Sequence, residues 1–448
     1  MTEKEARALL DQVLGAAQGR EVEAILGGGV SRLTRFANNE ITQNVSENRV
    51  ELSVRVVDGK RTGRANGNDL SQQGIERLLD AAAAAARVQP EIPDLLPLPG
   101  RQSYLTVDAD DSTTGDLDAD GRASEVKRAV ERCVEAGVTA AGIYETGRGT
   151  IGDYGMLDAM AIANTSGLFA YHRGTHATFR ISALDGAASG WAERESWRAS
   201  DVDGAALADR AVEKAIRSRG AMPWDPGAYT VVLEPAAVAD LLMDLSWTSL
   251  GALAMQEGRS FLSGRIGERV MGEKITLRDD PFHPLHRGSP FDAEGIPTRP
   301  TTLIERGIAR GPVYDRPTAA KEGKESTGHS LPIPNTIGPL ARHLVLDGGA
   351  GPPEALLDGI ERGLWVTRVW YTNVVDPMTA TLTGMTRDGL FAIENGRITH
   401  AVRNFRFNQS VVEMLNRVEG MSESVRAGGV VCPALRIQGF HMSSVTEF

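Results

Sequence analysis

The sequence predicts an α+β protein of two domains, an N-terminal α+β domain at residues 1–220 and a mostly β domain at residues 221–448. Three observations predict this division. Helical and strand-like hydrophobic periods alternate in the first half, and strand-like runs dominate the second half. A break containing proline and glycine, at residues 219–228, separates the two halves. The chain has 448 residues, which is long enough for two or three hydrophobic cores.

The N-terminal half opens with an amphipathic helix, because Leu9, Leu10, Val13 and Leu14 recur at helical spacing. Apolar and polar residues then alternate over residues 50–57, as in a half-buried strand. The Asp-Gly pair at 58–59 predicts a tight turn into a return strand at 60–65. The other elements expected here are a helix at 70–89, a proline-rich connector at 89–100, helices at about 124–136 and 203–217, and strands between 150 and 183.

The C-terminal half opens with a strand at 228–233. Pro235 then occupies an allowed first-turn position of a helix, whose apolar face follows the spacing of Val238, Leu241 and Leu245. The remainder reads as strands and turns. Two tripeptides between apolar runs, Arg-Asp-Gly at 387–389 and Glu-Asn-Gly at 394–396, predict hairpin turns.

The charge balance argues against a nucleic-acid partner, since 59 acidic and 48 basic residues leave a net charge of −11. Aromatic residues make up only 5%, too few for base-stacking platforms. Two cysteines, Cys133 and Cys432, cannot form a disulfide scaffold, which favours a reducing compartment. The charged N-terminus does not read as an export signal, and no run of 18 apolar residues occurs. We therefore expect a cytoplasmic protein without a membrane partner.

Two short motifs suggest ligands but lack the required context. Gly147–Gly152 fits GxGxxG, yet a strand pattern follows it where a dinucleotide site needs a helix, so turn glycines are the better interpretation. Asp116, Asp118 and Asp120 resemble the start of a calcium loop. Lys127 stands where such a loop needs a bidentate glutamate, so we expect an acidic surface loop.

Histidine pairs and single nucleophiles give weaker signals still. His172 and His176 would lie about 13 Å apart on one strand, too far for a shared metal. The remaining candidates are His283 with His286 beside Asp279 and Asp280, for which a metal site stays open against a surface loop, and Ser330 and Cys432, for which burial is the alternative to a nucleophilic role.

Longer blocks carry more information than these motifs. They are MQEGRSFLSGRIGERV at 255–270, EGIPTRPTTLIERGIARGPVYDRPTA at 294–319, LPIPNT at 331–336, AIENGRITHAVRNFRF at 392–407 and MLNRVEG at 414–420. With the hairpin-like segment at 35–67 and the Asn-Thr-Ser-Gly turn at 164–167, they resemble the TldD/PmbA family over essentially the whole chain. This family comprises two-subunit TldD/TldE metallopeptidases, once called modulators of DNA gyrase.

The resemblance also indicates what this chain lacks. The TldD-type subunit carries HExxxH, in which two histidines bind zinc and the glutamate is a general base. Registration on the Gly-Arg pair at 264–265 puts Met243, Asp244 and Thr248 at those three positions, and no HExxxH occurs in the chain. The family's cysteine ligand falls at Val425, while Cys432 stands beside Pro433. The resemblance therefore implies a TldE/PmbA-type subunit with no catalytic residue, no metal and no cofactor of its own.

The same resemblance implies a heterodimer with a TldD-like HExxxH subunit that holds the zinc. Unfolded or extended peptides, such as precursor or leader peptides, would be degraded or trimmed in a closed cavity, read mainly through main-chain hydrogen bonds. Six residues of the resembling blocks are candidates for peptide binding or for the cavity wall: Arg265, Glu268, Asn335, Thr336, Asn416 and Arg417.

Two other functions stay open at this level. One is an autonomous hydrolase that uses Cys432 or a histidine–aspartate loop in place of the metal. The other is a peptide-binding or regulatory module without a peptidase partner. The sequence names no peptide substrate, and it does not separate a housekeeping role from a dedicated peptide-maturation pathway.

Overall fold

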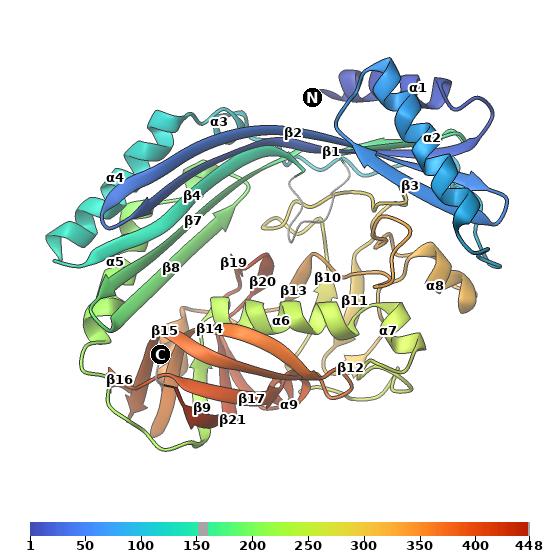
Figure 1. Cartoon of the computed structure of the whole chain (residues 1–448). Helices are drawn as coiled ribbons and strands as arrows, with labels where there is room; N and C mark the ends of the chain where they lie inside the picture. Colours follow the sequence, from blue (N-terminus) through green and yellow to red (C-terminus); the bar gives the residue numbers. More distant parts are fainter. Residues whose placement is uncertain (151–159, 447–448) are drawn as a thin grey trace.

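The computed structural model describes residues 1–150 and 160–446. An arched sheet formed by the N-terminal half lies over a C-terminal base, with helices on the outer side of the arch (Figure 1). Strand order in the arch is β3-β2-β1-β4-β7-β8, and β5 pairs with β1 and β6. Its strands are β1 (Glu21–Ala37), β2 (Glu40–Asp58), β3 (Arg61–Gly67), β4 (Thr139–Thr150), β5 (Ala161–Asn164), β6 (Phe169–Tyr171), β7 (Gly174–Asp185) and β8 (Ala188–Ser196).

Two separate hydrophobic cores stabilise the arch, one at each end. Helices α1 (Glu3–Gly15) and α2 (Gln72–Val88) cover one end, and α4 (Ala119–Glu135) and α5 (Gly204–Arg217) cover the other (Figure 1). The short helices α3 (Ser112–Gly115) and η2 (Ala199–Asp201) lie near the second core. Between the cores, β1 passes through Gly28 and Gly29, where a Cβ atom would meet the carbonyl oxygens of Arg49 and Arg148 at 2.2 Å. Glycine is therefore required where neighbouring strands approach β1 most closely.

The base contains a barrel and a smaller second sheet. Because β14 pairs with both β9 and β15, the strands β9, β14, β15, β17 and β21 close into a ring, and β16 and β18 pair with its members. The bounds are β9 (Gly227–Leu233), β14 (Arg362–Asp376), β15 (Thr381–Glu394), β16 (Arg397–Ala401), β17 (Phe405–Ser410), β18 (Val418–Met421) and β21 (Leu435–Val445).

The second sheet of the base has the order β12-β11-β10-β13-β20-β19. Its strands are β10 (Leu277–Asp279), β11 (Thr301–Glu305), β12 (Ile308–Ala309), β13 (Leu344–Leu346), β19 (Val425–Ala427) and β20 (Val430–Cys432). The helices of the base are α6 (Pro235–Ser249), α7 (Ala252–Gln256), α8 (Arg316–Lys321), α9 (Val411–Asn416) and the 3-10 turn η3 (Pro353–Leu357). One large core joins both sheets to α6.

Most elements confirm the sequence-based predictions, and the α+β fold class is confirmed. One predicted turn is wrong. Asp388 and Gly389 lie within the continuous strand β15, where both have positive φ and the pairing with β14 shifts register. Asp388 and Gly389 form a β-bulge and not a turn, because the residues before and after them pair with the same strand, β14. The Asn395-Gly396 hairpin turn between β15 and β16 is present as predicted.

No helix among the described residues is long and apolar enough to cross a membrane.

Candidate functional site

A cavity of about 740 Å³ lies between the arch and the base. Strands β7 and β8 line it from the arch, and α6, β14 and the turn between β19 and β20 line it from the base. Its size is in the range of ligand-binding cavities in general. Charged, histidine and tryptophan side chains from segments far apart in the sequence meet in its walls.

Helix α6 forms part of the base wall. It starts at Pro235, directly after β9, and Glu234 before it accepts hydrogen bonds from Lys214 of α5 and from Trp365 of β14, both at 2.7 Å. Its leucine face is buried in the base core. Ala236, Asp240 and Met243 recur at i, i+4 and i+7 and line the cavity. The helix to which the sequence registration assigns the zinc-motif positions is therefore at the cavity wall.

The three motif positions on α6 do not suit a zinc ion. Met243 is partly buried against the base core and presents a thioether. Thr248 donates its hydroxyl to the main-chain carbonyl of Asp244, one turn earlier, at 2.8 Å. Burial raises the pKa of Asp244, and the nearby Thr372 of β14 offsets this in part. No imidazole is present at these positions to bind a zinc ion.

The expected third ligand position is equally unsuitable. Val425, at the start of β19, offers no donor atom. Cys432 of β20 is fully buried, its Sγ donates to the Pro235 carbonyl at 3.3 Å, and burial raises its pKa. A thiol held protonated and out of solvent is neither a zinc ligand nor a nucleophile in this conformation.

The cavity walls carry opposed charges. Glu193 and Glu195 of β8 both pair with Arg180 of β7. The same two carboxylates accept hydrogen bonds from the main-chain N–H groups of Gly428 (3.2 Å) and Gly429 (2.8 Å) in the β19–β20 turn. These contacts join the arch to the base across the cavity.

Asp240 faces this acidic wall from α6. Its side chain is exposed to the cavity, and the surrounding walls exclude part of the bulk water. This partial burial, followed by the charge of Glu193, raises the pKa of Asp240 to about 7. The carboxyl is therefore able to exchange a proton near neutral pH.

A second polar cluster lies where the loops of the base reach the cavity. Asp279 of β10 contacts His329 Nε2 at 2.9 Å and His343 Nδ1 at 3.8 Å, and it accepts the main-chain N–H of His343 at 2.7 Å. Burial opposes ionisation of Asp279, but the two histidines outweigh it and hold its pKa well below the usual range. His286 packs edge-on against His343, and burial lowers the pKa of His286 well below its usual value.

The metal site that the sequence left open for His283 and His286, beside Asp279 and Asp280, is not assembled. His286 Nε2 donates to the Leu344 carbonyl at 2.8 Å, and Asp279 turns to other histidines. Across the described ranges 1–150 and 160–446, no three His, Cys, Asp or Glu residues are grouped to hold a metal ion. His329 and His343 are therefore the histidines that sequence reasoning missed, because only the loop paths bring them to Asp279.

The other short motifs resolve into local structure. His172 lies before β7 and not on a strand with His176, although both line the cavity, and burial followed by the charge of His343 lowers the pKa of His172 to about 4. Asp118 caps α4 by accepting the Gly121 N–H at 2.8 Å. Asp116 pairs with Arg148 at 2.9 Å, and Asp120 lies in the first turn of α4. The Ser330 hydroxyl donates to the Leu331 carbonyl at 2.9 Å.

The glycine motif is only partly described. Gly147, Gly149 and Thr150 belong to strand β4, and Ile151 and Gly152 lie outside the described residues.

The six candidate peptide-binding residues are not among those that line the cavity. Arg265 and Glu268 form an exposed ion pair at 3.2 Å. Asn335 accepts the N–H groups of Ile337 (3.1 Å) and Gly338 (2.6 Å), which makes it a turn residue beside exposed Thr336. Asn416 donates to the Val270 carbonyl at 3.0 Å, and Arg417 donates to the Gly439 carbonyl at 3.2 Å. These side chains connect loops of the base.

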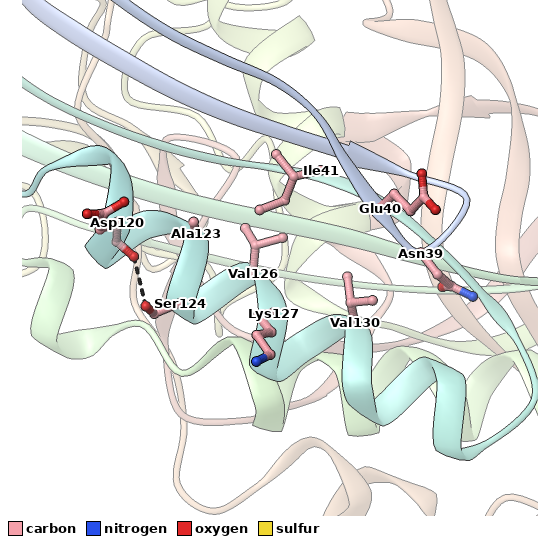
Figure 2. A pocket seen from close by; sticks show the side chains of 9 residues that line it. All are labelled: Asn39, Glu40, Ile41, Asp120, Ala123, Ser124, Val126, Lys127 and Val130. Carbon is pink, nitrogen blue, oxygen red and sulfur yellow. Dashed lines mark hydrogen bonds between the residues drawn. The ribbon is translucent and has the colours of Figure 1, made fainter.

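A second hollow, on the outer side of the arch, is lined by α4 and the turn between β1 and β2 (Figure 2). Its walls are mostly apolar, with Ile41, Val126 and Val130 facing it. The hydroxyl of Ser124 is directed at the main-chain carbonyl of Asp120 at 2.8 Å. This hollow lacks the converging charged groups of the inner cavity, which is therefore the better candidate site.

The sequence matches three PmbA/TldA metallopeptidase families in chain order. They are domain 1 at residues 22–86, the central domain at 104–219 and the C-terminal domain at 226–444. The chain belongs to the PmbA/TldD family. The first two matched regions contain most of the two cores of the arch, although helix α1 precedes them, and the third contains the core of the base.

Relatives from this family match over different lengths. The metalloprotease PmbA of Escherichia coli O157:H7 is 24% identical over 461 residues, which cover 98% of this chain and 96% of PmbA. A metalloprotease of Methanothermobacter thermautotrophicus is 27% identical over 230 residues, 50% of each chain, so this match spans about half the length of that relative. The crystal structure of TldE from Thermococcus kodakarensis shares the fold, with a TM-score of 0.86, 20% identity and coverage of 97% of this chain and 100% of TldE.

Proposed function

We propose that this chain is the metal-free, TldE-type subunit of a two-chain cytoplasmic peptidase of the PmbA/TldD family. A TldD-like partner with HExxxH would hold the zinc, and the cavity of this chain would form part of the chamber that receives extended peptide. One observation carries the proposal: α6 lines the cavity through Ala236, Asp240 and Met243, and Met243, Asp244 and Thr248 stand where the registration expects two zinc-binding histidines and a general base.

The composition of the cavity walls supports a role in holding peptide. An extended polypeptide presents main-chain N–H and C=O groups along its length, and these need polar partners when water is excluded. The cavity offers both signs of charge, with Arg180 and Arg426 near Glu193 and Asp240. Trp191 and Trp370 add flat apolar surfaces on either side of Arg368. Such a wall suits many side chains, so we expect weak sequence preference.

The test is to co-express this chain with the HExxxH homologue of the same genome and to purify through a tag on this chain alone. We expect one zinc per heterodimer by elemental analysis, and cleavage of an unfolded peptide only by the complex. Each chain alone should show background cleavage.

The matched control replaces the glutamate of the partner's HExxxH with glutamine, which should leave the complex intact and abolish cleavage. Stoichiometric zinc in this chain alone, or chelator-insensitive cleavage by it, would refute the proposal. Failure to co-purify with the partner would favour a binding module that acts without a peptidase.

A further inference from the structure

The outer part of the β14–β15 hairpin is the most exposed apolar segment of the base. Tyr371 is 71% exposed, and Trp370, Val374, Val375 and Met378 are each between 40% and 54% exposed. We call residues 369–378, which contain them, the arm. Residues 369–375 include no charge, and five of the seven are aromatic or valine.

One edge of the arm has main-chain N–H and C=O groups with which no described strand pairs. β14 pairs with β9 only over residues 363–366, and with β15 from Arg362 to Asp376. Beyond Val366, β15 is therefore the only strand paired with β14 in the part of the chain that the structure describes. Soluble proteins protect such strand edges with lysine, proline or β-bulges. Residues 369–375 contain neither lysine nor proline, and the pairing with β15 shifts register between Trp370 and Asn373 and between Val374 and Asp376. An apolar edge without charge or proline indicates a surface that another chain covers.

The size of the arm fits a subunit interface. A fully exposed Tyr or Trp presents roughly 150–250 Å², so Tyr371 and Trp370 together offer about 200 Å² at their observed exposures. The two valines and the methionine bring the apolar patch to roughly 400–500 Å², which is about half of the ~800 Å² that each partner buries in a standard interface. The arm can therefore supply the apolar centre of such an interface, but not all of it.

The arm is also continuous with the cavity. Trp370 lines the cavity and is 43% exposed. Thr372 lies near enough to Asp244 of α6 to act on the pKa of that carboxyl, so the arm lies beside the helix with the degenerate motif. A chain docked on the arm would therefore cover this side of the cavity.

We infer that the arm is the docking surface for the partner subunit, a second chain of this same fold that carries HExxxH. This inference rests on the proposed function. A chain of the same fold presents an equivalent hairpin, and two unpaired strand edges complement each other across an approximate two-fold axis. Docking there brings the motif helices of both chains to one chamber.

The first test weakens the arm without disturbing its fold. Tyr371 has φ +56°, a conformation that asparagine tolerates better than tyrosine, and threonine keeps the β-branched shape of valine. The variant Tyr371→Asn/Val375→Thr should bind the partner at least tenfold more weakly than the wild type, with an unchanged melting temperature. The matched control is Val88→Thr/Leu105→Asn, two exposed apolar residues of the arch, which should bind like the wild type.

The second test measures coverage directly. Both native cysteines are buried, so the single thiol introduced by Met378→Cys can be labelled selectively. The partner should slow its maleimide labelling at least tenfold, whereas the thiol of a Val88→Cys variant should react at the same rate with and without partner. Equal partner affinity of the arm variant, or an unprotected thiol in the complex of the Met378→Cys variant, would overturn the inference and leave the proposed function standing.

Two other outcomes separate the remaining possibilities. In the first, this chain forms a homodimer that the arm variant disrupts, and the HExxxH partner does not bind the arm. The occupant of the arm would then be a second copy of this chain, and the inference would be overturned. A wild-type chain that does not bind the HExxxH homologue at all would refute the proposed function itself.

Discussion

Two carboxylates, Glu23 of β1 and Asp240 of α6, show how differently this protein uses buried charge. Glu23 is fully buried between two guanidiniums, with Arg55 at 2.7 and 3.1 Å and Arg64 at 2.7 Å. Burial opposes its ionisation, but both arginines outweigh it and lower the pKa of Glu23. Asp240 faces another carboxylate, Glu193, and has its pKa raised to about 7.

The difference separates a structural joint from a reactive surface. Arg64 also donates to the Ile333 carbonyl, so the Glu23 cluster joins the arch to the loop at 331–336 in the base. Each charge there touches one of opposite sign. Asp240 instead lies beside a carboxylate of like charge, and such a charge next to an open cavity is typical of functional sites. Removing each feature should therefore have a distinct consequence.

The largest effect is expected at the joint. Glu23→Gln leaves two buried guanidiniums without a counter-charge, which should lower the free energy of unfolding by about 3–5 kcal/mol. Urea unfolding at pH 7 measures this. Glu47→Gln is the control, since Glu47 pairs with Arg49 at the surface and should cost less than ~1 kcal/mol. Equal losses would show that the two environments do not differ as described.

Restoring the HExxxH motif on α6 should give this chain a zinc site that the wild type lacks. The triple variant Met243→His/Asp244→Glu/Thr248→His supplies two imidazoles and a carboxylate, so its Kd for Zn²⁺ should fall at least tenfold below that of the wild type, or about 1.4 kcal/mol. Chelator competition on the isolated chain measures this. Thr248→His alone is the control and should gain little. Tight stoichiometric zinc in the wild type would contradict the registration.

The two carboxylates should impose opposite pH dependences. The lowered pKa of Glu23 gives stability that is present above its unfolded pKa, near 4.3, and lost on acidification. The raised pKa of Asp240 gives stability that is present below about 4 and lost as the pH rises to about 7. Asp240→Asn should therefore flatten the pH dependence between 4 and 7 and stabilise the protein at pH 8, by less than ~1 kcal/mol because the cavity is solvated.

Thermal melts at pH 4, 6 and 8 measure this dependence. Asp94→Asn, at an exposed aspartate, is the control and should track the wild type at each pH. An Asp240→Asn curve parallel to that of the wild type would argue against proton exchange at Asp240.

The smallest effect is expected at the exposed Arg265–Glu268 pair. Glu268→Gln should change the free energy of unfolding by less than ~0.5 kcal/mol, because side chains in water gain little from pairing. Peptide cleavage by the complex should also be unchanged, since neither side chain lines the cavity. A loss of cleavage with intact stability would return this pair to the list of peptide-binding candidates.

Patterns along the chain were sufficient for most of the fold. The helical spacing at Leu9–Leu14 and the turn at Asp58-Gly59 predicted α1 and the β2–β3 hairpin, because these elements are decided by neighbours in sequence. The same reasoning failed at Asp388-Gly389, where a residue with positive φ made a bulge inside β15. Local turn preference cannot distinguish the two outcomes, since the pairing of β15 with β14 across the bulge selects between them.

The chain by itself determined that α6 forms and that its motif positions hold Met243, Asp244 and Thr248, because side-chain identity and helical spacing are properties of sequence. Only the tertiary structure decided what surrounds that helix. Glu193 reaches Asp240 because the arch lies over the base, and loops of irregular path bring His329 and His343 to Asp279. Burial and charge act through space, so the pKa of each group depends on neighbours that the order of residues does not reveal.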